Sequence, residues 1–251
     1  MKKIISREYE RFAILCKLTY PSVFNHKHYG YSEQKMVHDN FGKAFCRVIS
    51  NDLETVVVFR GTRDFSDWAT NLKLWPKKKS EKGMIYCVHS GFDSALDVND
   101  CKAGQSAFNY LVELLEPHIS HNRKIFFTGH SLGGALAVLA AHRINKLHEN
   151  CIDSIYTFGQ PAVGFGGFSG VYKLGEKTYR ICGGMDVVTF LPGPFYRHVG
   201  KQYWVHDGKV YTDVHWATRI VKSIILMLTS LIGDHSMNKY IRYKSFFDKE
   251  K

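Results

Sequence analysis

The sequence predicts a single α/β domain in which a mostly parallel central sheet is flanked by helices. Predicted strands and helices alternate along the chain, which is the pattern of layered α/β folds. With 251 residues, 45% of them hydrophobic, the chain is long and apolar enough to bury one large core. No internal repeat or shift in composition divides it, so residues 1–251 are expected to form one domain.

The first part of the chain predicts a helix followed by a hairpin. Apolar residues recur at helical spacing over residues 7–18, and the pattern ends before Pro21. Two β-branched runs, Phe45–Ile49 and Thr55–Phe59, are separated by a short polar turn, which indicates two paired strands. The sheet is therefore expected to begin with this hairpin.

The rest of the chain alternates between the two kinds of element. Lys124–Thr128 is typical of a buried strand, and Ala135–Ile144 is apolar on all sides, which predicts a central helix. The other predicted elements are a helix over 103–115 closed by Pro117, strands over 154–158 and 178–182, a hairpin over 203–211 and a helix over 216–232.

Charge, cysteine content and hydropathy narrow the class of protein. Lys and Arg number 34 against 23 Asp and Glu, a net charge of +11, but no nucleic-acid-binding motif accompanies the excess. Six cysteines are too sparse for a disulfide scaffold, so free thiols are expected. No apolar run is long enough to span a bilayer. No signal peptide follows Met1, so we expect a cytoplasmic location, with export by another route left open.

The segment Gly129-His130-Ser131-Leu132-Gly133 carries the chemistry. It matches Gly-x-Ser-x-Gly between a predicted strand and a predicted helix, which is the setting of a nucleophile elbow. The two glycines leave room at the turn, and the first helical N–H, that of Leu132, can stabilise a developing oxyanion. Ser131 is therefore the candidate nucleophile; a plain serine N-cap at a glycine-rich helix start is the alternative.

Further motifs lie on both sides of the elbow, namely Phe59–Thr62, His89–Phe92, Thr128–Ala137 and Thr157–Pro161. Together they resemble the class 3 lipases, the family of fungal secreted triacylglycerol lipases and their bacterial relatives, and we expect a bacterial-type member. The resemblance implies an α/β-hydrolase fold with a short lid. It also implies that Thr62 stabilises the oxyanion through its N–H and its hydroxyl.

The carboxylate and the base of a triad should follow the nucleophile in the order Ser, Asp, His. Asp186 follows a predicted strand, at the sheet edge where catalytic groups gather, and it matches the family's motif with Leu191-Pro192 shortly after. His235 lies in a segment that resembles the family's terminal catalytic histidine. The remaining histidines after Asp186 are weaker candidates for the base: His198, His206 and His215.

The region after Thr62 resembles the family's lid, here about residues 64–70, with Phe65 and Trp68 as its apolar residues. A lid covers an apolar groove in water and opens at an interface; a fixed surface helix is the alternative. A lysine-rich loop follows, which we expect to be mobile and either to attract anionic headgroups or simply to be solvated. Its lysines are at positions 73, 77, 78, 79 and 82.

The sequence thus predicts a serine carboxylic-ester hydrolase that acts on acylglycerols or similar lipids through an acyl-enzyme. We expect no cofactor, no metal and no nucleic-acid partner, and possible partners are the lipid ester and an anionic membrane surface. A phospholipase A1 is the enzymatic alternative. A basic lipid-binding or membrane-interaction module with a vestigial hydrolase site is the alternative from another class.

Overall fold

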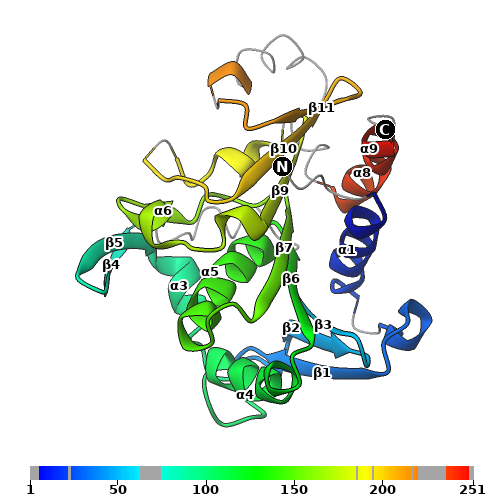
Figure 1. Ribbon diagram of the computed structural model, residues 1–251, viewed down its shortest axis with the longest axis vertical. Coiled ribbons are helices and arrows are strands. Elements are labelled where there is room, and N and C mark those ends of the chain that lie inside the picture. Colours follow the sequence, from blue (N-terminus) through cyan, green and yellow to red (C-terminus); the bar gives the residue numbers. More distant parts are fainter. Residues whose placement is uncertain are drawn as a thin grey trace.

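The computed structural model describes residues 6–21, 24–62, 75–184, 186–193, 195–215, 217–219 and 236–248. Its main sheet has the strand order β1-β2-β3-β6-β7-β9-β10-β11 (Figure 1). The strands from β3 to β10 in this order are parallel, whereas β1, β2 and β11 pair antiparallel at the edges. The bounds are β1 Glu33–His38, β2 Ala44–Ser50, β3 Glu54–Phe59, β6 Lys124–His130, β7 Ile152–Phe158, β9 Thr178–Gly183, β10 Lys201–His206 and β11 Lys209–Thr212.

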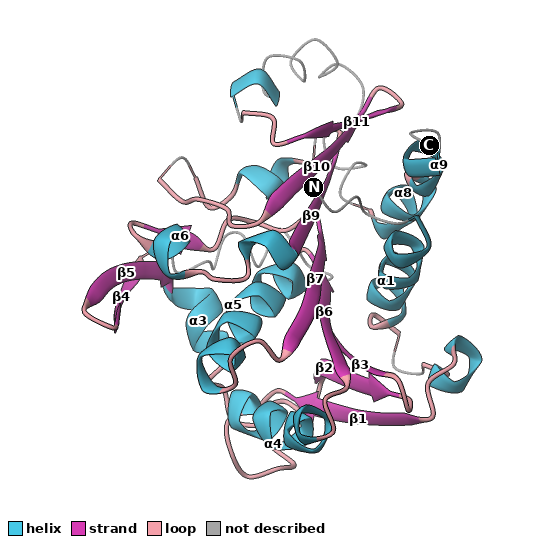
Figure 2. Cartoon of the chain, viewed as in Figure 1, coloured by secondary structure: helices cyan, strands magenta, loops and turns pink. Residues whose placement is uncertain are grey.

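Helices cover both faces of this sheet (Figure 2). On one face lie α1 (Ser6–Leu18), α8 (Met237–Arg242) and α9 (Lys244–Asp248), and on the other α3 (Ser90–Ala95), α4 (Ala107–Ser120) and α5 (Leu132–Leu147). The described part of the chain also contains the short helical turns η1 His26–Tyr29, α6 Phe168–Val171, η2 Gly175–Lys177 and η3 Val187–Phe190. The predicted mostly parallel sheet flanked by helices is confirmed, as is the predicted β2–β3 hairpin. The sheet begins one strand earlier than expected, with β1.

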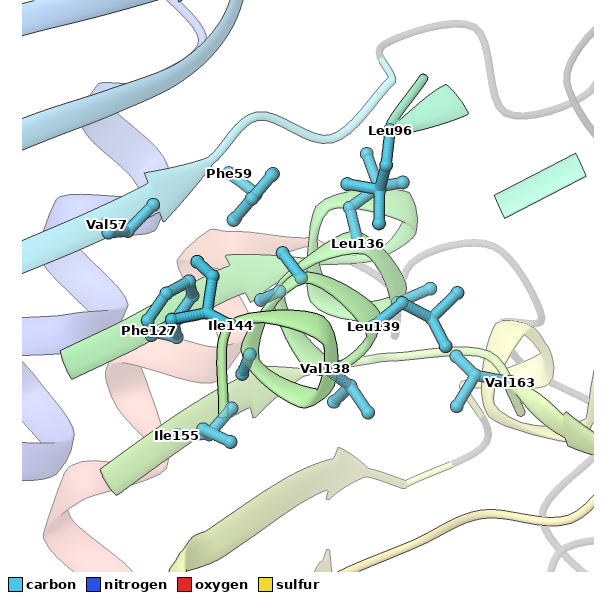
Figure 3. Packing of buried hydrophobic residues seen from close by; sticks show 14 of the residues in the cluster. Val57, Phe59, Leu96, Phe127, Leu136, Val138, Leu139, Ile144, Ile155 and Val163 are labelled. Carbon is cyan, nitrogen blue, oxygen red and sulfur yellow. The ribbon is translucent and has the colours of Figure 1, made fainter. Parts of the chain in front are cut away.

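The centre of the fold is α5, which is buried on nearly every side. Figure 3 shows Leu136, Val138 and Ile144 of this helix among apolar side chains of β3, β6 and β7. Leu139 faces Val163 on the segment that follows β7. Because Ser131 immediately precedes this helix, its position is fixed by the larger of the two apolar clusters that the described residues form.

The helix predicted to close at Pro117 continues to Ser120, so that boundary was wrong. Ser106 caps its start by accepting a hydrogen bond from the Asn109 N–H at 3.2 Å. Proline in the last turn removes only one backbone donor, and the Pro117 carbonyl still accepts from the His121 N–H at 3.2 Å. The turn therefore closes despite the proline.

The lysine run is not a mobile loop, which corrects the prediction. It forms β4 (Pro76–Glu81) in a second sheet of order β4-β5-β8, with β5 Met84–His89 and β8 Gly164–Phe165. Lys77 and Lys79 point to the same side of β4, and each Nζ contacts the buried carboxylate of Asp93, at 2.7 and 2.6 Å. These two ion pairs hold the lysines against α3.

Several sequence predictions fall outside the described residues. These are the lid residues Phe65 and Trp68, the base His235, and residues 220–232 of the last predicted helix. Among the described helices, none is long and apolar enough to cross a membrane. The six cysteines are free.

Candidate active site

Ser131 stands at a strained turn between β6 and α5. Its φ of 57° and ψ of −129° lie outside the regions that non-glycine residues favour. Its N–H donates to the Phe158 carbonyl at 2.9 Å, which holds the turn to the neighbouring strand β7. The strain is typical of a nucleophile elbow, and the structure thus confirms the strand–turn–helix setting that the motif requires.

The two glycines of the motif are required by close backbone contacts. A Cβ on Gly129 would lie 2.2 Å from the Gly133 carbonyl oxygen, and a Cβ on Gly133 would lie 2.5 Å from the Phe59 carbonyl oxygen. These contacts involve backbone, which cannot rotate away. The elbow therefore depends on the absence of both side chains.

The Ser131 side chain is buried, and its Oγ has no hydrogen-bond partner among the described residues. A buried hydroxyl normally has one. In a nucleophile, such a hydroxyl is free to bond to a base and then to attack a substrate. The candidate base His235 lies outside the described residues.

Asp186 lies where β9 ends, and its side chain is completely buried. Oδ1 accepts from the Val188 N–H at 3.0 Å, and Oδ2 accepts from the Tyr240 hydroxyl at 2.6 Å. The same hydroxyl accepts from the Gly183 N–H at 3.0 Å. Two donors thus fix the orientation of the carboxylate, as an orienting residue of a triad requires.

Tyr240 was missed by sequence reasoning. Burial, and next the charge of Asp186, raise the pKa of the Tyr240 hydroxyl well above its usual value, so it remains a donor. The backbone carbonyl of Tyr240 in turn accepts from the Tyr9 hydroxyl on α1. The only signal in the sequence was that Tyr240 follows His235 closely in a helical segment. That signal could not show that Asp186 is its hydrogen-bond partner.

The histidine inside the elbow motif packs against Tyr20 and Tyr240. His130 Nδ1 lies 2.7 Å from the Tyr20 hydroxyl, and its ring lies edge-on to Tyr240 with centroids 5.9 Å apart. His89 is also buried, and its Nδ1 accepts a hydrogen bond from the Phe92 N–H at 3.3 Å. Burial lowers the pKa of His89 to about 4, so it is neutral near pH 7.

The weaker candidates for the base have other contacts. His198 Nε2 donates to the Thr189 carbonyl at 2.9 Å, and His206 stacks on Trp204 with centroids 4.4 Å apart. His215 Nδ1 accepts from the Ala217 N–H at 3.3 Å. No hydrogen bond joins any of these described histidines to Ser131 Oγ.

The two candidate oxyanion donors lie next to the elbow. Thr62 follows β3, and the parallel register of β3 and β6 pairs Phe59 with Gly129. A Cβ on Gly61 would lie 2.6 Å from the His130 carbonyl oxygen, so the segment before Thr62 packs directly on the turn. Leu132 is the first residue of α5. These contacts place the segment before Thr62 and the start of α5 beside the turn, and the role of the two N–H groups as an oxyanion hole stays a prediction.

In the described part of the chain, no group of three or more His, Cys, Asp or Glu side chains is arranged to hold a metal ion.

A family model described as lipase (class 3) matches residues 56–196, more than half of the chain. The chain is 33% identical over 166 residues to secreted mono- and diacylglycerol lipase 1 of Fusarium solani, covering 64% of this chain and 46% of that protein. It is 28% identical over 172 residues to phospholipase A1-II 1 of Oryza sativa subsp. indica, covering 62% and 44%. The chain spans about half the length of the curated relatives it matches.

The fold is similar to that of a solved triacylglyceride lipase from Rhizomucor miehei. The TM-score is 0.66 at 20% sequence identity, over 93% of this chain and 95% of the other. This similarity confirms the α/β-hydrolase fold expected for the sheet.

Two expectations are not upheld by these relatives. The predicted cytoplasmic location is contradicted, because the relative from Fusarium solani is named as a secreted enzyme. An apparent lack of a signal peptide was a weak guide, since it depends on where the sequence begins. The expectation of a bacterial-type member is unsupported, because the three relatives just named come from fungi and a plant.

Proposed function

Since the chain belongs to the class 3 lipase family, we propose that it hydrolyses carboxylic esters of lipids through an acyl-enzyme, with residues 1–251 acting as one domain. The observation that carries the proposal is the buried hydroxyl of Ser131 at a strained elbow, with no hydrogen-bond partner in the described part of the chain. A vestigial site would have no reason to keep this strain.

In the proposed mechanism, Ser131 attacks the ester carbonyl while His235 accepts its proton. Asp186, held by the Val188 N–H and the Tyr240 hydroxyl, orients the imidazole. The negative charge of the tetrahedral intermediate is stabilised by the N–H groups of Thr62 and Leu132. His235 then protonates the leaving alcohol, and water hydrolyses the acyl-enzyme with the same base. No cofactor enters this scheme.

Acylglycerols are the proposed substrates, and the mono- and diacylglycerol lipase among the relatives supports this class. Hydrolysis of phospholipids at the A1 position is the second candidate, supported by the relative named phospholipase A1-II 1. Turnover of matched emulsions of diacylglycerol and phosphatidylcholine would separate the two, since the preferred substrate should have the higher kcat/KM.

Replacing the nucleophile tests the proposal. Ser131→Ala should lower turnover of a p-nitrophenyl ester by on the order of 10⁴-fold or more, because no other group can form the acyl-enzyme. Ser120→Ala removes a hydroxyl on α4 that bonds only to the Glu116 carbonyl among described residues, and it should leave turnover unchanged. Equal activity of Ser131→Ala and the parent would contradict the assignment.

The base can be tested in the same way. His235→Ala should be nearly as damaging as loss of the nucleophile, because proton transfer accompanies the attack. His198→Ala should retain most of the turnover, since the His198 ring bonds to the Thr189 carbonyl and not to Ser131. If His198→Ala were the more damaging change, the assignment of the base would be wrong.

The lipid surface is proposed to meet the outer face of the β4–β5–β8 sheet, which follows the predicted lid residues Phe65 and Trp68 in the sequence. Cross-strand pairing places Ile85, Lys78 and Phe165 on one face, and Ile85 is exposed. Trp75 precedes β4 and is 79% exposed. Apolar side chains beside the exposed Lys78 suit an anionic membrane surface. Lys77, by contrast, forms an ion pair with Asp93 and points to the other face of the sheet.

Vesicle binding tests this contact independently of catalysis. In the Ser131→Ala background, Trp75→Ala should weaken binding to vesicles of phosphatidylcholine and phosphatidylglycerol by about tenfold, because a bilayer-inserting ring is lost. Phe41→Ala is the matched control, since Phe41 is equally exposed, at 79%, in the turn between β1 and β2. Equal weakening of vesicle binding by both changes would contradict the proposal that this face of the sheet contacts the membrane.

A further inference from the structure

Two arginines lie buried together beneath the loop that carries Asp186. Arg180 on β9 is 6% exposed and Arg219 is 1% exposed. The register of β9 and β10 pairs Arg180 with Gln202, and Trp204 lies two residues further along β10. The Arg219 Cζ is 5.7 Å from the centroid of the Trp204 ring. Both guanidinium groups therefore lie against the same part of the sheet.

Three buried nitrogens of this pair have no hydrogen-bond partner in the described part of the chain. Nε and Nη1 of Arg180 and Nε of Arg219 are buried without a hydrogen bond. Arg219 Nη2 donates to the Thr189 hydroxyl at 2.7 Å, which is the one described bond of the pair. No salt bridge joins either arginine to a described carboxylate. Asp213, the acid whose charge reaches Arg180, is exposed and accepts from the Gln202 N–H at 2.9 Å.

His198 lies beside the two arginines and adds no negative charge. Burial, and next the charge of Arg180, hold the pKa of His198 well below its usual value, so the ring is neutral. Its Nε2–H donates to the Thr189 carbonyl, which leaves Nδ1 as an acceptor. That Nδ1 and the Gln202 Oε1 are also buried without a described partner. The cluster thus contains two positive charges, together with hydrogen-bond donors and acceptors that have no described partner.

Burying two guanidinium groups near each other, with no carboxylate partner among the described residues, is strongly unfavourable, and proton loss cannot relieve the cost because arginine stays charged. Burial and the repulsion of Arg219 both lower the pKa of Arg180, which reflects the same cost. Buried water could satisfy the unmet donors and acceptors, but it would leave the charge uncompensated. A small anion would accept the free N–H groups and compensate the charge together.

We propose that Arg180 and Arg219 bind a small monovalent anion, of the size and charge of chloride, at their free N–H groups. Both side chains are closed off from solvent, which favours a monatomic anion over a phosphate or a carboxylate. Water would complete the site at His198 Nδ1 and Gln202 Oε1. The site is joined to the proposed catalytic loop, because Arg219 donates to the Thr189 hydroxyl, which itself donates to the Asp186 carbonyl at 2.7 Å.

Thermal unfolding at constant ionic strength tests the site in the intact chain. Replacing methanesulfonate by chloride at about ten times its dissociation constant should raise Tm by about 3 to 5 °C, because only the folded state has the site. Arg219→Gln should abolish this rise. Arg47→Gln is the control, since Arg47 is also buried but donates to the Pro21 carbonyl at 3.3 Å, and it should keep the rise.

Crystals grown in sodium bromide locate the anion directly. An anomalous peak within hydrogen-bond distance of Arg180 and Arg219, together with the chloride-dependent Tm, would support the proposal. Only ordered water at this place, or a bromide peak with no halide effect on Tm, would overturn it. Should Arg219→Gln fail to fold, the parent protein still decides between these outcomes, because both measurements can be made on it.

Discussion

The two sides of the proposed catalytic centre are built in different ways. β6 delivers Ser131 through backbone geometry, by a strained turn whose two glycines lie so close to other backbone that an added Cβ would be 2.2 or 2.5 Å from a carbonyl oxygen. β9 delivers Asp186 through side-chain bonds, and one of its donors, Tyr240, is 54 residues further along the chain.

The difference has an energetic consequence. Backbone atoms at van der Waals contact cannot yield, so an added side chain at the elbow must displace a strand or a helix. A hydrogen bond between side chains has a net value of about 1 kcal/mol, and its loss can be partly relieved by small movements. Changes at the elbow should therefore be more damaging than comparable changes around the carboxylate.

The largest effect is expected for Gly129→Ala. The new Cβ would lie 2.2 Å from the Gly133 carbonyl oxygen, so we expect a loss of about 3 kcal/mol or more in the free energy of unfolding. Gly170→Ala is the control, because no atom outside its own helix and chain neighbours lies within 4 Å of the added Cβ. Urea unfolding measures both. Similar stabilities of the two variants would contradict the claim that the elbow cannot accommodate a side chain at position 129.

A smaller effect is expected for Tyr240→Phe, which keeps the ring and removes the donor to Asp186 and the acceptor for the Gly183 N–H. We expect a loss of about 1 to 3 kcal/mol in the free energy of unfolding. We also expect about a tenfold fall in kcat for a soluble ester with little change in KM, because the carboxylate loses its orientation.

Tyr179→Phe is the matched control for this change, since Tyr179 is a buried tyrosine on β9 whose ring stacks on Tyr156, with centroids 4.9 Å apart. Its kcat should be unchanged. A fall in stability with an unaltered kcat in Tyr240→Phe would show that the carboxylate side needs no side-chain support.

The last effect is gradual and depends on pH, and it concerns a third turn, where β5 meets α3. Here a buried side chain, that of His89, caps the helix, and burial lowers its pKa to about 4 from 6.5. Above pH 6.5 both folded and unfolded states are neutral. As pH falls from 6.5 to 4, only the unfolded state gains the proton, so stability should decrease by up to about 1 kcal/mol per pH unit from this group.

His89→Asn keeps a capping acceptor and removes the titration, so the pH dependence of the unfolding free energy should be flatter between pH 6.5 and 4. Urea unfolding over this pH range measures it. If the pH dependence of the unfolding free energy were the same in His89→Asn and the parent, burial would not lower the pKa of His89 as proposed.

The features that the sequence by itself determined belong mainly to the Ser131 elbow, which is built from backbone geometry. Gly-x-Ser-x-Gly between an apolar strand and an apolar helix predicted the elbow, because the strand, the turn and the helix that form it are consecutive in the chain. Ser131, the β2–β3 hairpin and the parallel sheet followed from such local patterns. Asp186 was predicted from its place after a strand, without any knowledge of its donors.

Tertiary structure alone decided which side chains meet across long stretches of the chain. Lys77 and Lys79 alternate as strand residues do, but lysine is a poor strand former, and only the position of Asp93 on α3 shows why that strand forms. The pairing of Tyr240 with Asp186 and the meeting of Arg180 with Arg219 are of the same kind. Periodicity reports which face of an element is apolar; it does not report which polar group the folded chain will bring against it.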